Sequence, residues 1–242
     1  MNQQQSSPPV RSPQTVLITG ASGALGLQVA RRFVQAGVTV HATWFGGTRP
    51  SPGPDQPWLE RVKWLEMDVR DIESVRRGMP KGPEGHDGVD ALVHCAGGFR
   101  WTHADEVSDE DLEFLIDTNL KSAFHVVRAV LPGMKKRGFG RIVFVGARAT
   151  RAGGAGMGPY AASKAGINLL TESLAEEVKG LDINVNAVLP SIIDTPANRR
   201  DMPQADPSKW VRPDELADII FALTQPWSRA IHGALIPVSG RV

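Results

Sequence analysis

The chain is poor in cysteine, in tyrosine and in net charge. It has one cysteine and one tyrosine among 242 residues, and 27 basic against 26 acidic side chains leave a formal charge of +1. A single cysteine, Cys95, excludes an internal disulfide and fits a reducing compartment. The balanced charge offers no basic surface for nucleic acid or for an anionic membrane. These absences favour a cytoplasmic protein that acts on a small molecule.

Long apolar runs are also missing. No stretch approaches the roughly 18 consecutive apolar residues of a membrane-spanning helix, and the first residues, MNQQQSSPPVRSP, are polar and contain prolines. We therefore expect no membrane association and no signal peptide, with residues 1–13 as a disordered tail. Hydrophobic residues make up 41% of the chain, enough for one sizeable core. Residues 14–242 are predicted to form a single domain.

Apolar, β-branched runs alternate with helical patterns along the chain. The runs expected as strands are 15–20, 38–43, 62–69, 89–97, 141–146, 183–190 and 233–240, and helical periodicity marks 24–37, 108–131, 158–180 and 213–225. Ser108 is the expected N-cap of the second helix, with Asp111 in its first turn. The stretch 45–57 is too rich in proline and glycine for a helix. This alternation predicts an α/β protein with a doubly wound, parallel, seven-stranded sheet and helices on both faces.

A glycine-rich turn, TGASGALG (19–26), joins the first strand to the first helix. Glycines let the backbone approach a pyrophosphate, and the helix N-terminus offers unpaired N–H groups and the positive end of the helix dipole. A tight turn between a strand and a helix also needs glycine. Its place after the first strand of an alternating chain favours dinucleotide binding, through Gly20, Ser22, Gly23, Ala24, Leu25 and Gly26.

The turn is followed by YAASK (Tyr160–Lys164), which places a phenol and an ammonium one helical turn apart, and later by LPSIIDTP (189–196). In this order the motifs resemble those of the short-chain dehydrogenase/reductase family, from residue 15 to 242. The resemblance implies a Rossmann fold, a nicotinamide cofactor, no metal, and oxidoreduction at a CH–OH or CH–NH group with Tyr160 as acid or base. It implies that Lys164 lowers the Tyr160 pKa and binds the cofactor ribose, and that Asn119 holds a water of the proton relay.

The same resemblance implies further cofactor contacts at the strand ends: Thr43, Trp44, Asp68, Val69, Ala96, Gly97, Gly98, Pro190, Ile193 and Thr195. The second strand ends in HATWFGG, without an acid. Because an acid there would repel the 2′-phosphate of NADP, we expect NADP(H) to be favoured over NAD(H), with Arg49 as a candidate partner of the phosphate. Asp68 is nearly as well explained as the cap of the following helix, and Cys95 as a small core residue.

The serine that most of the family places thirteen residues before the tyrosine is replaced by Ala147. Losing one preorganised donor costs about 3 kcal/mol in the transition state. Three alternatives stay open: Thr150 supplies the hydroxyl, backbone N–H groups of the glycine-rich loop replace it, or the substrate needs no donor. A narrower resemblance favours the third. The branch of quinonoid dihydropteridine reductase has the tyrosine and lysine without the serine, and GALG, AGGF and LPSIIDTPANRRDMPQADPSKW resemble its stretches.

We therefore expect an NAD(P)(H)-dependent oxidoreductase that acts on a small carbonyl or alcohol, or on a quinonoid dihydropterin-like substrate. The alternative is a dinucleotide-binding sensor or partner subunit with little catalysis, because Ala147 stands where the serine is usual. Residues 197–210 are expected to cover the substrate as a loop. Members of the family usually form homodimers or homotetramers through the two long helices and the last strand, and we expect the same here.

Overall fold

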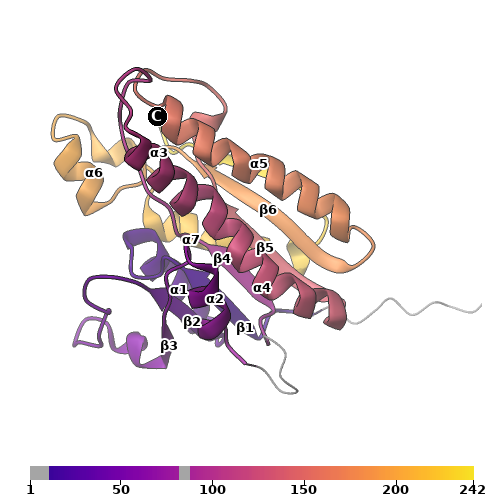
Figure 1. The fold of residues 1–242 in the computed structure, drawn as a ribbon. Coiled ribbons are helices and arrows are strands. Elements are labelled where there is room, and N and C mark those ends of the chain that lie inside the picture. Colours follow the sequence, from indigo (N-terminus) through magenta and orange to yellow (C-terminus); the bar gives the residue numbers. More distant parts are fainter. Residues whose placement is uncertain (1–10, 82–87) are drawn as a thin grey trace, which may run out of the picture.

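A parallel sheet of seven strands runs through the middle of the molecule in the computed structural model, which describes residues 11–81 and 88–242 (Figure 1). The predicted tail, residues 1–13, falls mostly outside the described residues. In spatial order the strands are β3 (Val62–Glu66), β2 (Thr39–Trp44), β1 (Thr15–Thr19), β4 (Ala91–His94), β5 (Phe139–Val145), β6 (Asp182–Pro190) and β7 (Leu235–Val238). Every neighbouring pair is parallel. The predicted doubly wound α/β fold is confirmed.

Helices cover both faces of this sheet. One face packs against α1 (Ala24–Gln35) and α7 (Pro213–Leu223), where the rings of Phe33 and Phe221 meet edge to face at 5.1 Å. The other face packs against α2 (Ile72–Gly78), α4 (Ser122–Arg137) and α5 (Gly158–Val178). Two shorter helices, α3 (Asp109–Ile116) and α6 (Pro196–Asp201), lie at the end of the molecule where the loops after the strands gather (Figure 1).

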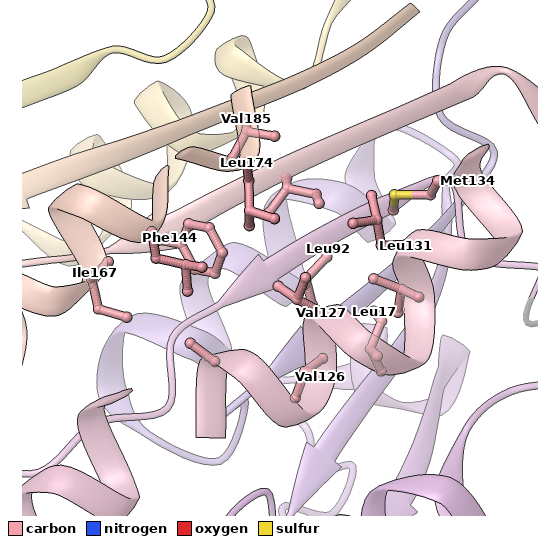
Figure 2. Packing of buried hydrophobic residues seen from close by; sticks show 14 of the residues in the cluster. Leu17, Leu92, Val126, Val127, Leu131, Met134, Phe144, Ile167, Leu174 and Val185 are labelled. Carbon is pink, nitrogen blue, oxygen red and sulfur yellow. The ribbon is translucent and has the colours of Figure 1, made fainter. Parts of the chain in front are cut away.

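The hydrophobic core consists of two layers, one on each side of the sheet. Along β1, Leu17 points into the layer under α4 and α5, whereas Val16 and Ile18 point into the layer under α1 and α7. Figure 2 shows the first layer, in which Leu17, Leu92 and Phe144 from the sheet meet side chains of α4 and α5. Because successive side chains of a strand point to opposite faces and both faces are covered, the strands are almost continuously apolar.

The long helix expected over 108–131 is divided into α3, a π-helical turn (Asp117–Lys121) and α4. Ser108 is the N-cap as predicted, and its hydroxyl accepts a hydrogen bond from the Asp111 N–H at 3.1 Å. The expected end at Leu131 is wrong, because α4 continues through Pro132 and ends only before Gly138, whose φ is +64°. A proline inside a helix removes one backbone hydrogen bond. Burial of α4 side chains before and after it, Leu131 among them, offsets that loss.

Two further elements differ from the prediction. Helix α2 was not expected, and it begins at an N-cap, Asp71, whose side chain accepts from the Glu73 N–H at 2.9 Å. Asp71 therefore caps this helix, and the capping role considered for Asp68 is wrong. The segment 197–210, expected as a loop, contains most of α6 and a single 3₁₀ turn over 207–209.

Candidate active site

The predicted site residues gather at the carboxyl ends of the strands. Gly20 follows β1, Ala96 follows β4, Ala147 follows β5 and Pro190 ends β6. The strand order reverses beside β1, because β2 and β3 lie on one side of it and β4 to β7 on the other. Ligands of open α/β sheets bind in the crevice at such a switch point. The fold therefore brings together, at the carboxyl ends of the strands, segments that are distant in the sequence.

The glycine-rich turn packs too closely for side chains. Gly20 has a φ of +61°, and a Cβ on it would lie 2.7 Å from Ala96 Cα. A Cβ on Gly26 would lie 2.3 Å from the Gly20 carbonyl oxygen. Helix α1 begins after Gly23, and no side chain of the described residues caps it, so its first N–H groups face outward. Exposed Ser22 and Gly23 border these donors, and the turn therefore fits the pyrophosphate of a dinucleotide.

Two more glycines form the floor of the site after β4. A Cβ on Gly97 would lie 2.8 Å from Lys164 Nζ and 3.0 Å from Asn119 Oδ1. A Cβ on Gly98 would overlap the Phe114 ring, at 2.5 Å. Only the backbone of Gly97 therefore fits between the lysine and the asparagine.

Asn119 lies within the π-helical turn and is fully buried. Its Oδ1 accepts from the Gly98 N–H at 2.9 Å, and its Nδ2 donates to the Gly98 carbonyl and to Ser163 Oγ, each at 2.9 Å. Both amide hydrogens are thus engaged, so the side chain can hold the expected water only as an acceptor. The amide joins the loop after β4 to α5. Single π-helical turns are common at functional sites.

Tyr160 and Lys164 lie one turn apart in α5. Lys164 is 5% exposed, and its ammonium donates to the Val145 carbonyl oxygen at 2.9 Å. Burial lowers the Lys164 pKa to about 8. Burial also raises the Tyr160 pKa to about 12. The structure thus does not show the expected lowering of the Tyr160 pKa, because the lysine is hydrogen-bonded to the β5 backbone and desolvation dominates at the phenol.

The position of the usual serine is filled by a buried methyl group. Ala147 is 5% exposed and lies just after β5. The nearby Thr150 hydroxyl donates to the Ala147 carbonyl oxygen at 2.8 Å and accepts from Asn168 Nδ2 at 2.8 Å. Its single hydrogen is already used, so Thr150 does not replace the serine in this arrangement. Two of the three alternatives for the missing serine remain: backbone N–H groups that replace its hydroxyl, or a substrate that needs no donor.

The residues predicted to contact the adenosine lie at the ends of β2 and β3. Thr43 is buried, and its hydroxyl accepts from the Gly20 N–H at 3.2 Å, while Trp44 ends β2. Asp68 binds Arg70 through both carboxylate oxygens, at 3.0 and 2.9 Å, which lowers the Asp68 pKa. The Arg70 guanidinium lies 5.7 Å from the centre of the Phe45 ring. The sequence pattern pointed to Arg49, and the fold adds a second cation, Arg70, near Phe45, the residue that follows β2.

The residues predicted to contact the nicotinamide lie in the segment after β6. Ile193 pairs with Val211 in a short parallel bridge. The Thr195 hydroxyl accepts from the Asn198 N–H at 3.1 Å as N-cap of α6, which leaves its hydrogen free to donate. Asp194 binds Arg199 through two bonds of 2.6 and 2.7 Å and holds the start of α6 to the segment. The predicted contacts Pro190, Ile193 and Thr195 thus lie in one short stretch.

Aromatic residues beside Tyr160 were not singled out from the sequence. The rings of Phe99 and Tyr160 meet edge to face at 4.9 Å, and Trp101 follows two residues later. The signal that could have found them is the pair of aromatic residues, Phe99 and Trp101, directly after the AGG stretch that follows β4. In residues 11–81 and 88–242, no cluster of three or more His, Cys, Asp or Glu could hold a metal ion. The same residues include no helix that is both long and apolar enough to span a membrane.

Comparison with known proteins agrees with this geometry. The sequence model of the short chain dehydrogenase family matches residues 14–206. The chain is 31% identical over 234 residues to a 3-oxoacyl-[acyl-carrier-protein] reductase of Vibrio harveyi, which covers 93% of this chain and 95% of the relative. It is 35% identical over 196 residues to an oxidoreductase of Salmonella typhimurium, covering 80% and 74%.

Solved structures of short-chain dehydrogenases and reductases are also similar to this chain. A short-chain dehydrogenase/reductase family protein has a TM-score of 0.84 at 27% identity, covering 93% of this chain and 95% of that one. A variant of actinorhodin polyketide ketoreductase with NADPH has a TM-score of 0.82 at 27% identity, covering 94% and 96%. The chain belongs to the short-chain dehydrogenase/reductase family and is an NAD(P)-dependent oxidoreductase. By name, the V. harveyi reductase and the ketoreductase act on carbonyl groups, and they give no support to the narrower dihydropteridine reductase resemblance.

Proposed function

We propose that the protein reduces a carbonyl group of a small molecule, with NADPH as the hydride source and Tyr160 as the general acid. The observation that carries the proposal is the meeting of Tyr160, Lys164 and the glycine floor at Gly97 at one sheet edge, beside the uncapped start of α1. Nicotinamide, when bound, supplies the hydride. The residues of the chain bind the dinucleotide, orient the acceptor and provide the proton.

The state of Tyr160 favours reduction over oxidation. With a pKa of about 12, the phenol keeps its proton at neutral pH. It therefore has a proton to donate to an oxygen on which negative charge develops, whereas oxidation of an alcohol would first require the phenol to lose that proton. Lys164 is mostly charged at neutral pH, since its pKa is about 8, and we propose that its ammonium, next to Gly97, binds a ribose hydroxyl.

The preference for NADPH is supported by charge at the end of β2. This strand ends without an acid, and Arg70 lies beside Phe45, the next residue of the chain. The Nε and Nη2 of Arg70 already donate to Asp68, so a phosphate would contact the Nη1 edge of this guanidinium. The ketoreductase structure described above contains NADPH. Arg70, with Arg49 as the second candidate, is proposed to favour the 2′-phosphate.

Ala147 restricts the kind of carbonyl. Neither Ala147 nor Thr150 provides a hydroxyl hydrogen to the substrate oxygen. We therefore propose an acceptor that is already activated, such as a carbonyl next to an electron-withdrawing group. A quinonoid dihydropterin is the second candidate, favoured by the same Ala147, because it is easily reduced without a strong donor. A sensor with little catalysis is disfavoured by the presence of both Tyr160 and Lys164.

Self-association is part of the proposal. The outer face of α4 and α5 exposes Phe124 and Leu169, which are 45% and 70% exposed, and an apolar groove runs between the two helices. Large exposed apolar surfaces commonly mark interfaces. We propose a homodimer or homotetramer that uses this face, which light scattering of the purified protein would test. The cytoplasmic location stays a prediction.

The experiment that tests the activity is steady-state oxidation of NADPH with ethyl acetoacetate, 2,3-butanedione and quinonoid dihydropterin. Wild type should turn over at least one of them, and Tyr160→Phe should lose about 10²- to 10⁴-fold in kcat, the usual contribution of a general acid. Binding of NADPH, followed by fluorescence, should be nearly equal in both proteins. Equal turnover by Tyr160→Phe would exclude the mechanism, and cofactor binding without turnover of any acceptor would favour the sensor.

A further inference from the structure

The ring of Phe99 lies against the ring of the proposed acid. Phe99 comes three residues after Ala96, in the loop that follows β4, and it is 48% exposed. Its ring centre is 4.9 Å from that of Tyr160, with an interplanar angle of 80°. An edge-to-face pair of this kind is a preferred aromatic arrangement. One aromatic surface beside the Tyr160 ring is thus held by this contact and is open to solvent.

Trp101 extends this surface and is held by a second loop. It is 58% exposed, yet its indole rests on Gly156, where a Cβ would lie 2.2 Å from the indole ring. Gly156 also has a φ of +72°, a conformation that favours glycine. The Thr102 N–H donates to the Gly156 carbonyl oxygen at 3.0 Å. The loop before α3 and the loop before α5 therefore lie side by side at the site, at the top of Figure 1.

A third ring completes the arrangement. His103 meets Trp101 edge to face, with ring centres 4.9 Å apart. Phe99, Trp101 and His103, which we call the aromatic wall, thus form an exposed strip that begins at Tyr160. Exposed aromatic side chains cost free energy in water unless a ligand covers them. Rings held in place by their backbone also lose little conformational entropy when a ligand binds.

We propose that the aromatic wall binds a flat aromatic ring that the substrate carries close to its reacting carbonyl, with Phe99 and Trp101 as the specificity-determining residues. This inference rests on the proposed carbonyl reduction. It adds the substrate class: an aryl-bearing carbonyl compound, in preference to one with an aliphatic chain or a puckered ring. Face and edge contacts between flat rings favour the aryl compound, because a puckered ring of similar size cannot lie flat against the wall.

A matched pair of substrates tests the proposal. Ethyl 3-oxo-4-phenylbutanoate and ethyl 4-cyclohexyl-3-oxobutanoate carry the same activated ketone and differ only in a flat against a puckered ring. Wild type with NADPH should prefer the phenyl compound by about tenfold in kcat/KM, chiefly through KM. Phe99→Leu and Trp101→Leu should each bring the ratio toward one, through a larger loss of kcat/KM for the phenyl compound than for the cyclohexyl compound. Trp227→Leu is the control, because Trp227 is 73% exposed in a turn before β7.

The outcomes separate the two proposals. A ratio near one in wild type, or a ratio that neither Leu variant changes, overturns the aromatic wall as a substrate site and leaves carbonyl reduction intact. No turnover of either compound, together with none of the acceptors named above, overturns carbonyl reduction and with it the wall. NADPH affinity of each variant should match wild type, which distinguishes a lost substrate contact from a damaged cofactor site. A lost ratio in Trp227→Leu would also contradict the assignment.

Discussion

The Lys164 ammonium donates to the Val145 carbonyl oxygen, 2.9 Å away, across the space between α5 and the end of β5. The lysine is 5% exposed, so this one bond accompanies a charge that has lost most of its hydration. The lowered pKa, about 8, expresses that cost. A residue that we propose to act in the reaction is therefore held at the expense of stability, which is common at active sites.

Replacing Lys164 by methionine should stabilise the protein and abolish its activity. The unfolded lysine holds its proton up to about 10.5 and the folded one only to about 8, so the charge destabilises the fold at neutral pH, and wild-type stability rises between pH 8 and 10.5. Lys164→Met should melt a few degrees higher at pH 7, and should lack that rise. Calorimetry at pH 7 and pH 9.5 checks both points, and a lower melting temperature for the variant at pH 7 would contradict this account.

Restoring a hydroxyl at position 147 should broaden the range of acceptors. Ala147→Ser adds a donor next to the reacting oxygen, and one such donor contributes about 3 kcal/mol to the transition state. We expect kcat/KM for unactivated ketones such as cyclohexanone to rise about 10- to 100-fold, with a much smaller change for ethyl acetoacetate. Ala147→Gly, which adds no hydroxyl, is the control. If both substrates gain equally, activation of the acceptor is not what compensates for the missing serine.

The cofactor floor should not tolerate a side chain at Gly97. A methyl group there would lie 2.8 Å from Lys164 Nζ and 3.0 Å from Asn119 Oδ1, so one of the two must move. Gly97→Ala should weaken NADPH binding at least about tenfold, equivalent to ~1.4 kcal/mol, in a fluorescence titration. Gly53→Ala is the matched control, because nothing lies within 4 Å of its Cβ position. Unchanged affinity in Gly97→Ala would place the cofactor elsewhere.

Acid should destabilise the protein through His94. This ring is 2% exposed, and burial lowers its pKa to about 3. Ser122 donates to the Thr118 carbonyl at 2.6 Å, so His94 Nε2 donates to Ser122 Oγ at 3.1 Å and Nδ1 accepts from Thr19 at 2.8 Å. The neutral ring fits this chain of bonds, and a second proton would remove the acceptor for Thr19.

The pKa values of His94 in the folded and unfolded states set the direction in which stability changes with pH. Below pH 6.5 the unfolded histidine takes up a proton and the folded one does not, so its contribution to stability falls as pH falls from 6.5 toward 3. Urea unfolding at pH 7 and pH 5 should show a smaller loss in His94→Asn than in wild type. Equal losses in the two proteins would mean that His94 does not titrate on unfolding in this range.

Much of the fold could be predicted because its signals are local. The β-branched runs around Leu17 and Leu92 are buried on both sides, and their composition alone indicates strands between helices. The end of α4 could not be predicted in this way. Pro132 normally stops a helix, and only burial of Leu131 and Met134 against the sheet carries the helix further. Helix α2 has only seven residues, too few for a clear period.

Some features of the candidate site could likewise be predicted from the sequence, and others could not. The spacing of Tyr160 and Lys164 and the loss of the serine at Ala147 are visible in the chain itself, because they depend on one helix and one position. The bond from Lys164 to Val145, the use of the Thr150 hydrogen within its own turn, and the aromatic wall beside Tyr160 depend on which loops meet. The sequence by itself thus determined the class of chemistry. The tertiary structure decided the charge state of its groups and the shape of the substrate site, because desolvation and contacts arise only when distant segments pack together.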